Sequence, residues 1–249
     1  MKALLLSTAL VLAPLTAIAL DLTNMTAAEK EAFGAQIREY LLENPQVLRE
    51  AIAVLEQRQE AEQAEADQAL VAANTADLYD DGYSWIGGNP EGDVTIVEFL
   101  DYSCGFCKRA HPEVTELVES DGNIRLIIKE FPILGEQSLI ASRFAIAALQ
   151  TEGPAAYKVA NDKLITLEGE VNDAALREIA DAAGMETEKV MDAMAAPEID
   201  GVIAQNRALA QRLQINGTPT FVMGGQMIRG YLPLDGMRQI VAEARDTAN

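Results

Sequence analysis

Apolar side chains recur at helical spacing in two segments near the N-terminus. Thr26 and Glu29 form a capping box, which predicts the start of the first helix. Asn44 and Pro45 predict the end of that helix and the start of the second, with Asn44 as its N-cap. The predicted apolar stripes are Phe33, Ile37 and Tyr40 on the first helix and Leu48, Ile52 and Leu55 on the second.

The stretch that follows has no large apolar side chain. Residues 56–68 consist only of Glu, Gln, Ala, Arg and Asp. Such a helix has no face to bury, which predicts a solvated spacer or a loose contact between chains. We therefore expect residues 20–75 to be a helical segment appended to a main domain. Its apolar stripes need a partner, and a second copy of the chain is one candidate.

The main domain opens with strand patterns. β-branched and aromatic runs bounded by turn residues predict buried strands at 94–100 and 124–129. Two shorter runs, 220–223 and 226–229, flank Gly224-Gly225 and predict a β-hairpin with a glycine turn.

Helical patterns fill the rest of this domain. Residues 87–93 carry turn signals where the domain begins. An Ala-rich block from about 135 to 213 has helical periodicity, and residues 233–245 predict a closing helix. The order of elements predicts an α/β domain over residues 76–249 with an all-helical insertion at about 135–213.

The first 19 residues have the pattern of a secretory signal peptide. Lys2 precedes an apolar run over residues 3–15, and Ala17-Ile18-Ala19 fits the small-x-small cleavage pattern. An uncleaved membrane anchor is the alternative, although the run contains Pro14 and is short for a span of about 20 residues. We expect cleavage near Ala19 and export to a compartment in which disulfides can form.

The formal net charge of the chain is −20. This charge argues against nucleic acid as a partner, because phosphate binding needs a basic surface. It favours solubility in a protein that meets many unfolded chains.

The two cysteines form the motif Cys104-Gly105-Phe106-Cys107, directly before a predicted helix at about 104–119. Unpaired backbone N–H groups and the dipole at a helix N-terminus stabilise a thiolate there. A thiolate attacks a disulfide sulfur and forms a mixed disulfide, which a second thiol resolves. We predict Cys104 as the nucleophile and Cys107 as the resolving thiol, with no cofactor besides their own redox-active disulfide.

A metal site is the alternative for the two thiols. Zinc usually needs four protein ligands, whereas the chain has one C-x-x-C pair and one histidine, His111. We expect His111 to be an ordinary helix-surface residue and expect no metal site.

The stretch from Val94 to Pro112 resembles the active-site strand and helix of the thioredoxin superfamily. In that family a proline kinks the helix five residues after the second cysteine, which is the position of Pro112. The resemblance implies that Glu98 is a buried acid that moves protons to and from Cys107. An edge-strand glutamate that faces water is the alternative.

Gly217-Thr218-Pro219-Thr220 resembles the cis-proline loop of the same superfamily. In the family this loop faces the C-x-x-C pair and holds the client chain as an added strand. The resemblance implies that Thr218 and Pro219, together with Gly105 and Phe106, bind substrate. An ordinary trans-proline turn is the alternative.

Within the superfamily, the helical insertion and the stretch 129–133 resemble the bacterial periplasmic disulfide oxidoreductases of the Dsb type. Residues 26–60 resemble the N-terminal segment of the copper-sensitivity suppressor proteins, a trimeric isomerase branch. The resemblance implies a thioredoxin fold and a periplasmic location. It implies as partners unfolded or misoxidised exported proteins and a membrane redox protein, with a homo-oligomer, such as a trimer, formed through residues 26–75.

The residues between the cysteines bear on the direction of exchange. Gly105-Phe106 is similar to the pair in periplasmic isomerases and differs from the Pro-His of strong oxidases. Fewer contacts to the thiolate mean a less stabilised reduced form, so isomerase or reductase use is favoured over net dithiol oxidation. A hypothesis of another class is a non-catalytic copper-binding or client-binding chaperone, because two thiolates can hold Cu(I).

Overall fold

The computed structural model describes residues 22–248, so the predicted signal peptide, residues 1–19, lies outside the described residues. The chain divides after Arg58 into two compact units, each with its own architecture. Among residues 22–248, no helix has both the length and the apolar content needed to cross a membrane.

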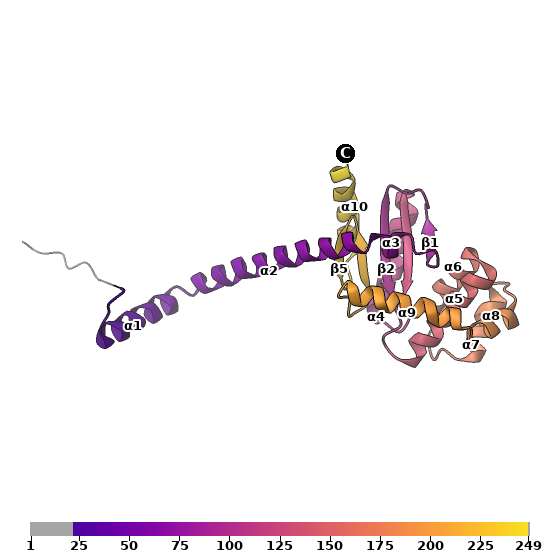
Figure 1. The fold of residues 1–249 in the computed structure, drawn as a ribbon, viewed down its shortest axis with the longest axis horizontal. Coiled ribbons are helices and arrows are strands. Elements are labelled where there is room, and N and C mark those ends of the chain that lie inside the picture. The colour runs from indigo at the N-terminus through magenta and orange to yellow at the C-terminus, as the bar shows by residue number, and fades with distance from the viewer. Residues whose placement is uncertain (1–21, 249) are drawn as a thin grey trace, which may run out of the picture. The chain divides into compact units, whose positions relative to one another are not determined.

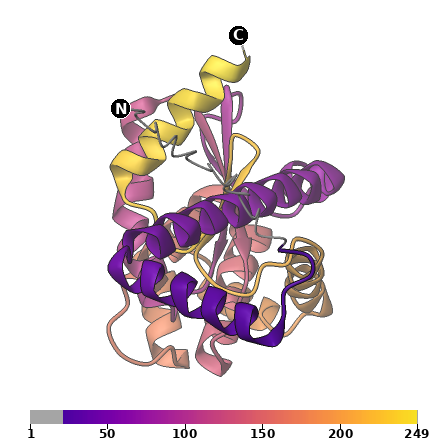
Figure 2. The ribbon, with the colours of Figure 1, turned by 90° about the vertical axis from the view of Figure 1, so that its left-hand side faces the viewer.

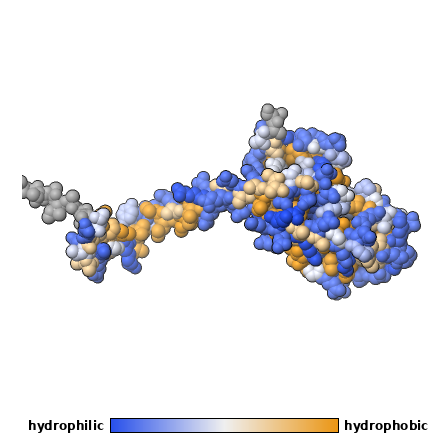
Figure 3. All heavy atoms as spheres, viewed as in Figure 1, coloured by the Kyte–Doolittle hydropathy of each residue, from blue (hydrophilic) through white to orange (hydrophobic). Residues whose placement is uncertain are grey.

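The first unit contains α1 (Ala27–Glu43) and the beginning of α2 (Gln46–Ala73). The predicted capping box is present, because the Thr26 hydroxyl accepts the Glu29 N–H at 3.3 Å and the Glu29 carboxylate accepts the Thr26 N–H at 2.8 Å. No residue of α1 is buried, and hydrophobic side chains lie on the surface of both helices (Figure 3). The six residues of the two predicted stripes are between 42% and 56% exposed.

The junction between these helices differs from the prediction. Asn44 is the C-cap of α1, since its backbone N–H and its side-chain amide both donate to the Tyr40 carbonyl, at 2.8 and 2.9 Å. The side chain therefore closes α1 and does not cap α2, which begins at Gln46 after Pro45.

The second unit is built on a five-stranded sheet in the order β1-β3-β2-β4-β5 (Figure 1). The central strands β2 and β3 are parallel, and all other neighbours are antiparallel. The prediction of β2, β4 and β5 is confirmed residue by residue, and β3 is one residue longer than predicted. The strands are β1 (Trp85–Gly88), β2 (Val94–Leu100), β3 (Ile124–Glu130), β4 (Thr220–Met223) and β5 (Gln226–Arg229).

Helices join and cover this sheet. The crossover from β2 to β3 is α4 (Gly105–Asp121), and the chain closes with α10 (Leu234–Ala248). In both ribbon views α10 lies along the strands, and the insertion helices gather at one end of the sheet (Figures 1 and 2). The insertion consists of α5 (Glu136–Glu152), α6 (Pro154–Ile165), α7 (Asp173–Ala182), α8 (Thr187–Ala193) and α9 (Pro197–Arg212).

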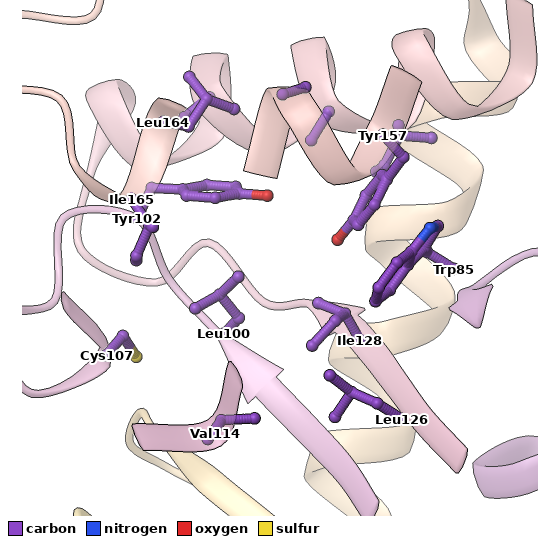
Figure 4. Packing of buried hydrophobic residues seen from close by; sticks show 14 of the residues in the cluster. Trp85, Leu100, Tyr102, Cys107, Val114, Leu126, Ile128, Tyr157, Leu164 and Ile165 are labelled. Carbon is purple, nitrogen blue, oxygen red and sulfur yellow. The ribbon is translucent and has the colours of Figure 1, made fainter. Parts of the chain in front are cut away.

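The two faces of the sheet bury different residues, because successive side chains of a strand alternate between faces. On β2, Ile96 and Leu100 join a core with α4, α10 and the insertion, whereas Val97 and Phe99 join a core with α3 (Thr75–Tyr79) and α9. Glu98 lies between Val97 and Phe99 in sequence and therefore faces the α4 side. Figure 4 shows this core, in which the rings of Trp85 and Tyr157 stack with centroids 5.2 Å apart.

The C-terminal part of α2 belongs to the second unit. Val71 is buried in the core on the α3 side, and the buried Asp67 pairs with Arg229 of β5. The sequence predicted a spacer over 56–68 and a boundary after residue 75, whereas the compact units divide after Arg58. The difference arises because two adjacent apolar side chains, Leu70 and Val71, and one ion pair fix this part of the helix, and neither feature produces a periodic pattern.

Candidate active site at the start of helix α4

The two cysteines lie at the N-terminus of α4. Cys104 is the N-cap residue, and its N–H donates to the Asp101 carbonyl at 3.1 Å. Cys107, one turn further, is fully buried, whereas Cys104 retains 7% exposure; both are free thiols. Only Cys104 is therefore placed to meet another protein's sulfur, and the orphan N–H groups of the first turn surround it.

The cis-proline loop lies against Cys104. The Cys104 thiol donates to the Thr218 carbonyl at 3.1 Å, although the two residues are 114 positions apart in sequence. The Thr218–Pro219 peptide bond is cis, as the resemblance implied. The Thr220 hydroxyl holds the turn by donating to the Gly217 carbonyl at 2.8 Å. The structure thus brings Cys104, the predicted nucleophile, together with the two residues predicted to bind substrate.

The other two predicted substrate-binding residues lie on the open side of the motif. Phe106 is 59% exposed and stacks on Tyr231, with ring centroids 6.5 Å apart. The Arg109 guanidinium lies 4.3 Å from the centre of the Tyr231 ring, and the Tyr231 hydroxyl donates to Glu113 at 2.6 Å. At Gly105 the position of a side chain is open space. The motif is therefore bordered by one exposed aromatic surface and an unobstructed approach.

Glu98 is buried, with 3% exposure, and so does not face water from an edge strand. It makes no hydrogen bond to a side chain or backbone group of the described residues. Burial, together with the charge of Glu130, raises the pKa of Glu98 to about 8. Burial, together with the charge of Glu98, raises the pKa of the Cys107 thiol. The charge of Glu98 therefore favours the protonated form of the Cys107 thiol.

Two further buried acids were missed in the sequence analysis. Asp101 accepts four hydrogen bonds, from the Ser103, Ile133 and Leu134 N–H groups and the Ser138 hydroxyl, at 2.7 to 3.0 Å. Glu130, at the end of β3, accepts three hydroxyl hydrogen bonds in the core. The signal that pointed to Glu98, an acid in an apolar strand, also applies to Glu130.

Replacing Glu98 by glutamine is expected to stabilise the reduced protein at alkaline pH. The folded-state pKa of about 8 exceeds the ordinary value of 4.5, so the folded protein keeps a proton that the unfolded chain releases. The destabilisation of the folded protein by Glu98 is absent below about pH 4.5, grows up to about pH 8 and is constant above it. Urea unfolding should show a gain on the order of 5 kcal/mol at pH 9 and little at pH 4.

The exposed Glu119 provides the matched control, since Glu119→Gln removes the same charge from the surface of α4. Equal gains at pH 9 and pH 4 for Glu98→Gln, or an equal gain for the control, would contradict the expected burial of a proton on Glu98.

Residues 22–248 contain no cluster of three or more His, Cys, Asp or Glu side chains arranged to hold a metal ion. His111 is only 19% exposed, with its Nε2 3.1 Å from the Asp162 carboxylate on α6. The pKa of His111 is lowered, mainly by burial. The expectation of an ordinary surface histidine is therefore wrong, because α6 of the insertion covers this side of α4.

Comparisons with known proteins divide the chain in a similar way. A family model described as "Thioredoxin" matches residues 80–243, and one described as "Copper resistance protein ScsC N-terminal domain" matches residues 29–62. Among curated relatives, two antiporters named NhaA from Salinispora tropica and Salinispora arenicola are 27% and 28% identical over 159 residues. The chain covers 24% of the length of each of these relatives.

Solved structures match over more of their length. A thioredoxin-like oxidoreductase from Silicibacter pomeroyi is 42% identical, with 69% of this chain and 97% of that chain covered and a TM-score of 0.64. The thiol-disulfide exchange protein alpha-DsbA2 from Wolbachia pipientis is 28% identical, with 72% and 96% covered and a TM-score of 0.67. ScsC from Proteus mirabilis is 27% identical, with 90% and 100% covered and a TM-score of 0.66.

Proposed function

The chain belongs to the thioredoxin family, and from that premise we propose that it is a periplasmic thiol–disulfide oxidoreductase that reshuffles or reduces disulfides of exported proteins. The observation that carries the proposal is the contact between the Cys104 thiol and the Thr218 carbonyl at the cis-proline loop. A free, slightly exposed thiol at a helix N-terminus is the chemistry of a nucleophile, and the loop beside it offers backbone groups to an incoming chain.

The exchange begins at Cys104. Its thiolate attacks one sulfur of a client disulfide, that S–S bond breaks, and the other client sulfur leaves as a thiolate. The mixed disulfide has two fates. A second client thiolate can attack it, which frees Cys104 and leaves a rearranged client. Alternatively, Cys107 passes its proton to the Glu98 carboxylate and attacks the Cys104 sulfur, which releases a reduced client.

The reverse direction uses the same groups. A client thiolate attacks the Cys104 sulfur of the enzyme disulfide, and Cys107 leaves as a thiolate. Protonated Glu98 then donates its proton to Cys107, which has a raised pKa and so a strong preference for the thiol form. Glu98 therefore acts as acid in one direction and base in the other.

Client binding is assigned to the rim of the motif. Thr218 and Pro219 hold the client backbone as an added strand, and the exposed Phe106–Tyr231 pair contacts an apolar side chain next to the client cysteine. The open space at Gly105 lets the client backbone approach the Cys104 sulfur closely. A membrane redox protein would regenerate the pair after each net reaction.

The six exposed residues of the two apolar stripes support assembly of several copies through the N-terminal helices. Isomerisation is faster when several active-site thiols face one client protein, because each raises the effective concentration of thiol near the client disulfides. The Gly105-Phe106 pair adds no polar side chain beside the thiolate, which supports isomerase or reductase use over strong oxidation.

Reactivation of a ribonuclease with scrambled disulfides tests the proposal. Residues 20–249 are expected to restore ribonuclease activity, and the Cys104→Ala variant is expected to restore none above background. Rapid oxidation of a reduced peptide without reactivation would instead make the protein a net dithiol oxidase. Equal client protection by the Cys104→Ala variant, without exchange by either protein, would identify a chaperone.

A further inference from the structure

Glu130 is a buried acid that the exchange steps above do not use. One carboxylate oxygen accepts the hydroxyls of Tyr102 and Tyr157, at 2.8 and 2.6 Å, and the other accepts the Ser142 hydroxyl at 2.7 Å. Figure 4 shows the two tyrosine hydroxyls pointing toward one another across the core. All four side chains are buried. Hydroxyl donors on both oxygens favour the ionised form of this carboxyl group, because a carboxylate accepts hydrogen bonds better than a neutral acid.

Glu130 and Glu98 lie on the same face of the sheet. In the parallel register of β2 and β3, Glu98 lies opposite Ile128, and Leu100 lies opposite Glu130. Residues two apart on a strand share a face, so the two acids are diagonal neighbours on the side that also buries Cys107. Glu98 makes no hydrogen bond within the described residues, whereas Glu130 accepts three.

Two carboxyl groups this deep in the protein do not ionise together readily, because their charges repel in a medium of low dielectric constant. The pair therefore keeps one proton near neutral pH. The hydroxyl donors stabilise the charge on Glu130, so the proton resides on Glu98. Burial is the main cause that raises the pKa of both acids.

Resting on the proposed function, we infer that Glu130 is a positioning residue that, as a clamped carboxylate, holds the shared proton on Glu98 beside Cys107. When the enzyme disulfide opens, the proton moves from the Glu98 carboxyl to the Cys107 thiolate, and Glu98 later takes a proton from water. The net result is one proton consumed and one thiol formed. The titratable groups that act on the two acids and on Cys107 are Asp101 and Tyr102 of the preceding loop, Cys104 of the motif and Tyr157 of α6.

The test is the pH dependence of disulfide opening by dithiothreitol, measured on residues 20–249 and divided by the thiolate fraction of the reagent. In the wild type this corrected rate should fall as pH rises through the pKa of Glu98. Glu130→Gln keeps the size and an acceptor oxygen but removes the negative charge, which makes Glu98 more acidic. The midpoint should therefore move to lower pH by about one unit. Asp101→Asn is the control, because it removes the charge of a buried acid that acts on Glu130 and not on Glu98. It should shift the midpoint less.

The variant Glu98→Gln distinguishes failure of the inference about Glu130 from failure of the proposed role of Glu98. Loss of the pH step in Glu98→Gln with an unchanged midpoint in Glu130→Gln would overturn the role of Glu130 and leave the proposed function intact. A pH step that persists in Glu98→Gln would instead remove Glu98 from the mechanism and the present inference with it.

A second measurement does not depend on the folding of Glu130→Gln. In the inferred order Glu130 ionises while Glu98 is still neutral, so Glu98→Gln should leave the titration midpoint of Glu130 unchanged. Carboxyl carbon NMR of Glu98→Gln and wild type reports that midpoint directly. An unchanged Glu130 midpoint supports the inference, and a downward shift, which would mean that Glu98 ionises before Glu130, refutes it.

Discussion

Replacing Cys104 by alanine is expected to abolish thiol–disulfide exchange, with a loss of roughly a thousandfold or more in the rate of client reduction. The large effect follows from burial, since Cys107 has no exposed surface and cannot reach a client sulfur in place of Cys104. The fold should survive, because Cys104 lies at the helix end and alanine keeps a small apolar side chain there, while the hydrogen bond to the Thr218 carbonyl is lost. Stopped-flow reduction of a disulfide peptide, with circular dichroism as a check of folding, measures both.

Cys107→Ala tests the predicted role of the second cysteine as the resolving thiol. It leaves attack by Cys104 intact and removes resolution, so the mixed disulfide with a client should accumulate and be visible by mass spectrometry under non-reducing conditions. Accumulation with Cys104→Ala instead would exchange the roles of the two thiols. If neither single variant trapped a client, the assignment of nucleophile and resolving thiol would be wrong.

The second large effect is expected at the exposed stripes of α1 and α2. Ile52→Glu should convert an assembly of residues 20–249 into monomers, because burying an isoleucine contributes about 1.5–3 kcal/mol and each copy would instead bring a charge to the interface. Reactivation of scrambled ribonuclease should fall to the level of an isolated active site, while reduction by dithiothreitol is unchanged. Light scattering gives the mass of the particle in each case.

Gln57→Glu is the control for this variant, since it introduces the same charge at an exposed polar position of the same helix. It should leave the assembly intact. A monomeric wild-type protein, or equal dissociation by both variants, would mean that the stripes of Phe33 and Ile52 do not join copies of the chain.

Turn chemistry and β-branched runs made much of the second unit predictable. Strand β2 and the hairpin β4–β5 are bounded by residues with strong conformational preferences, such as the glycines at 224 and 225, which both have positive φ. The motif residues Cys104 and Cys107 and the loop at Thr218 were identified from local sequence as well. These features could be predicted because each depends on a few neighbouring residues.

Features that depend on distant residues were not predicted. Strand β1 contains Gly87 and Gly88, which indicate a turn, yet a side chain at Gly87 would lie 2.0 Å from the Trp85 ring. The glycine there lets the indole fold over the strand, and the strand itself forms by pairing with β3, in which Trp85 lies opposite Ile128, a partner that a local pattern does not show. The Glu130 hydroxyl cluster was missed for the same reason, because its donors come from the 102 loop, α5 and α6.

The Asp101 carboxylate limits how this protein can be recombined with its relatives. It accepts hydrogen bonds both from Ser103, in the loop before the motif, and from Ile133 and Leu134, where the chain enters the helical insertion. A chimera that imports the insertion without a matching acid would leave these part-buried amide donors without their carboxylate partner. Asp101 therefore links the redox motif to the insertion, and domain grafting should cut the chain outside residues 101–138.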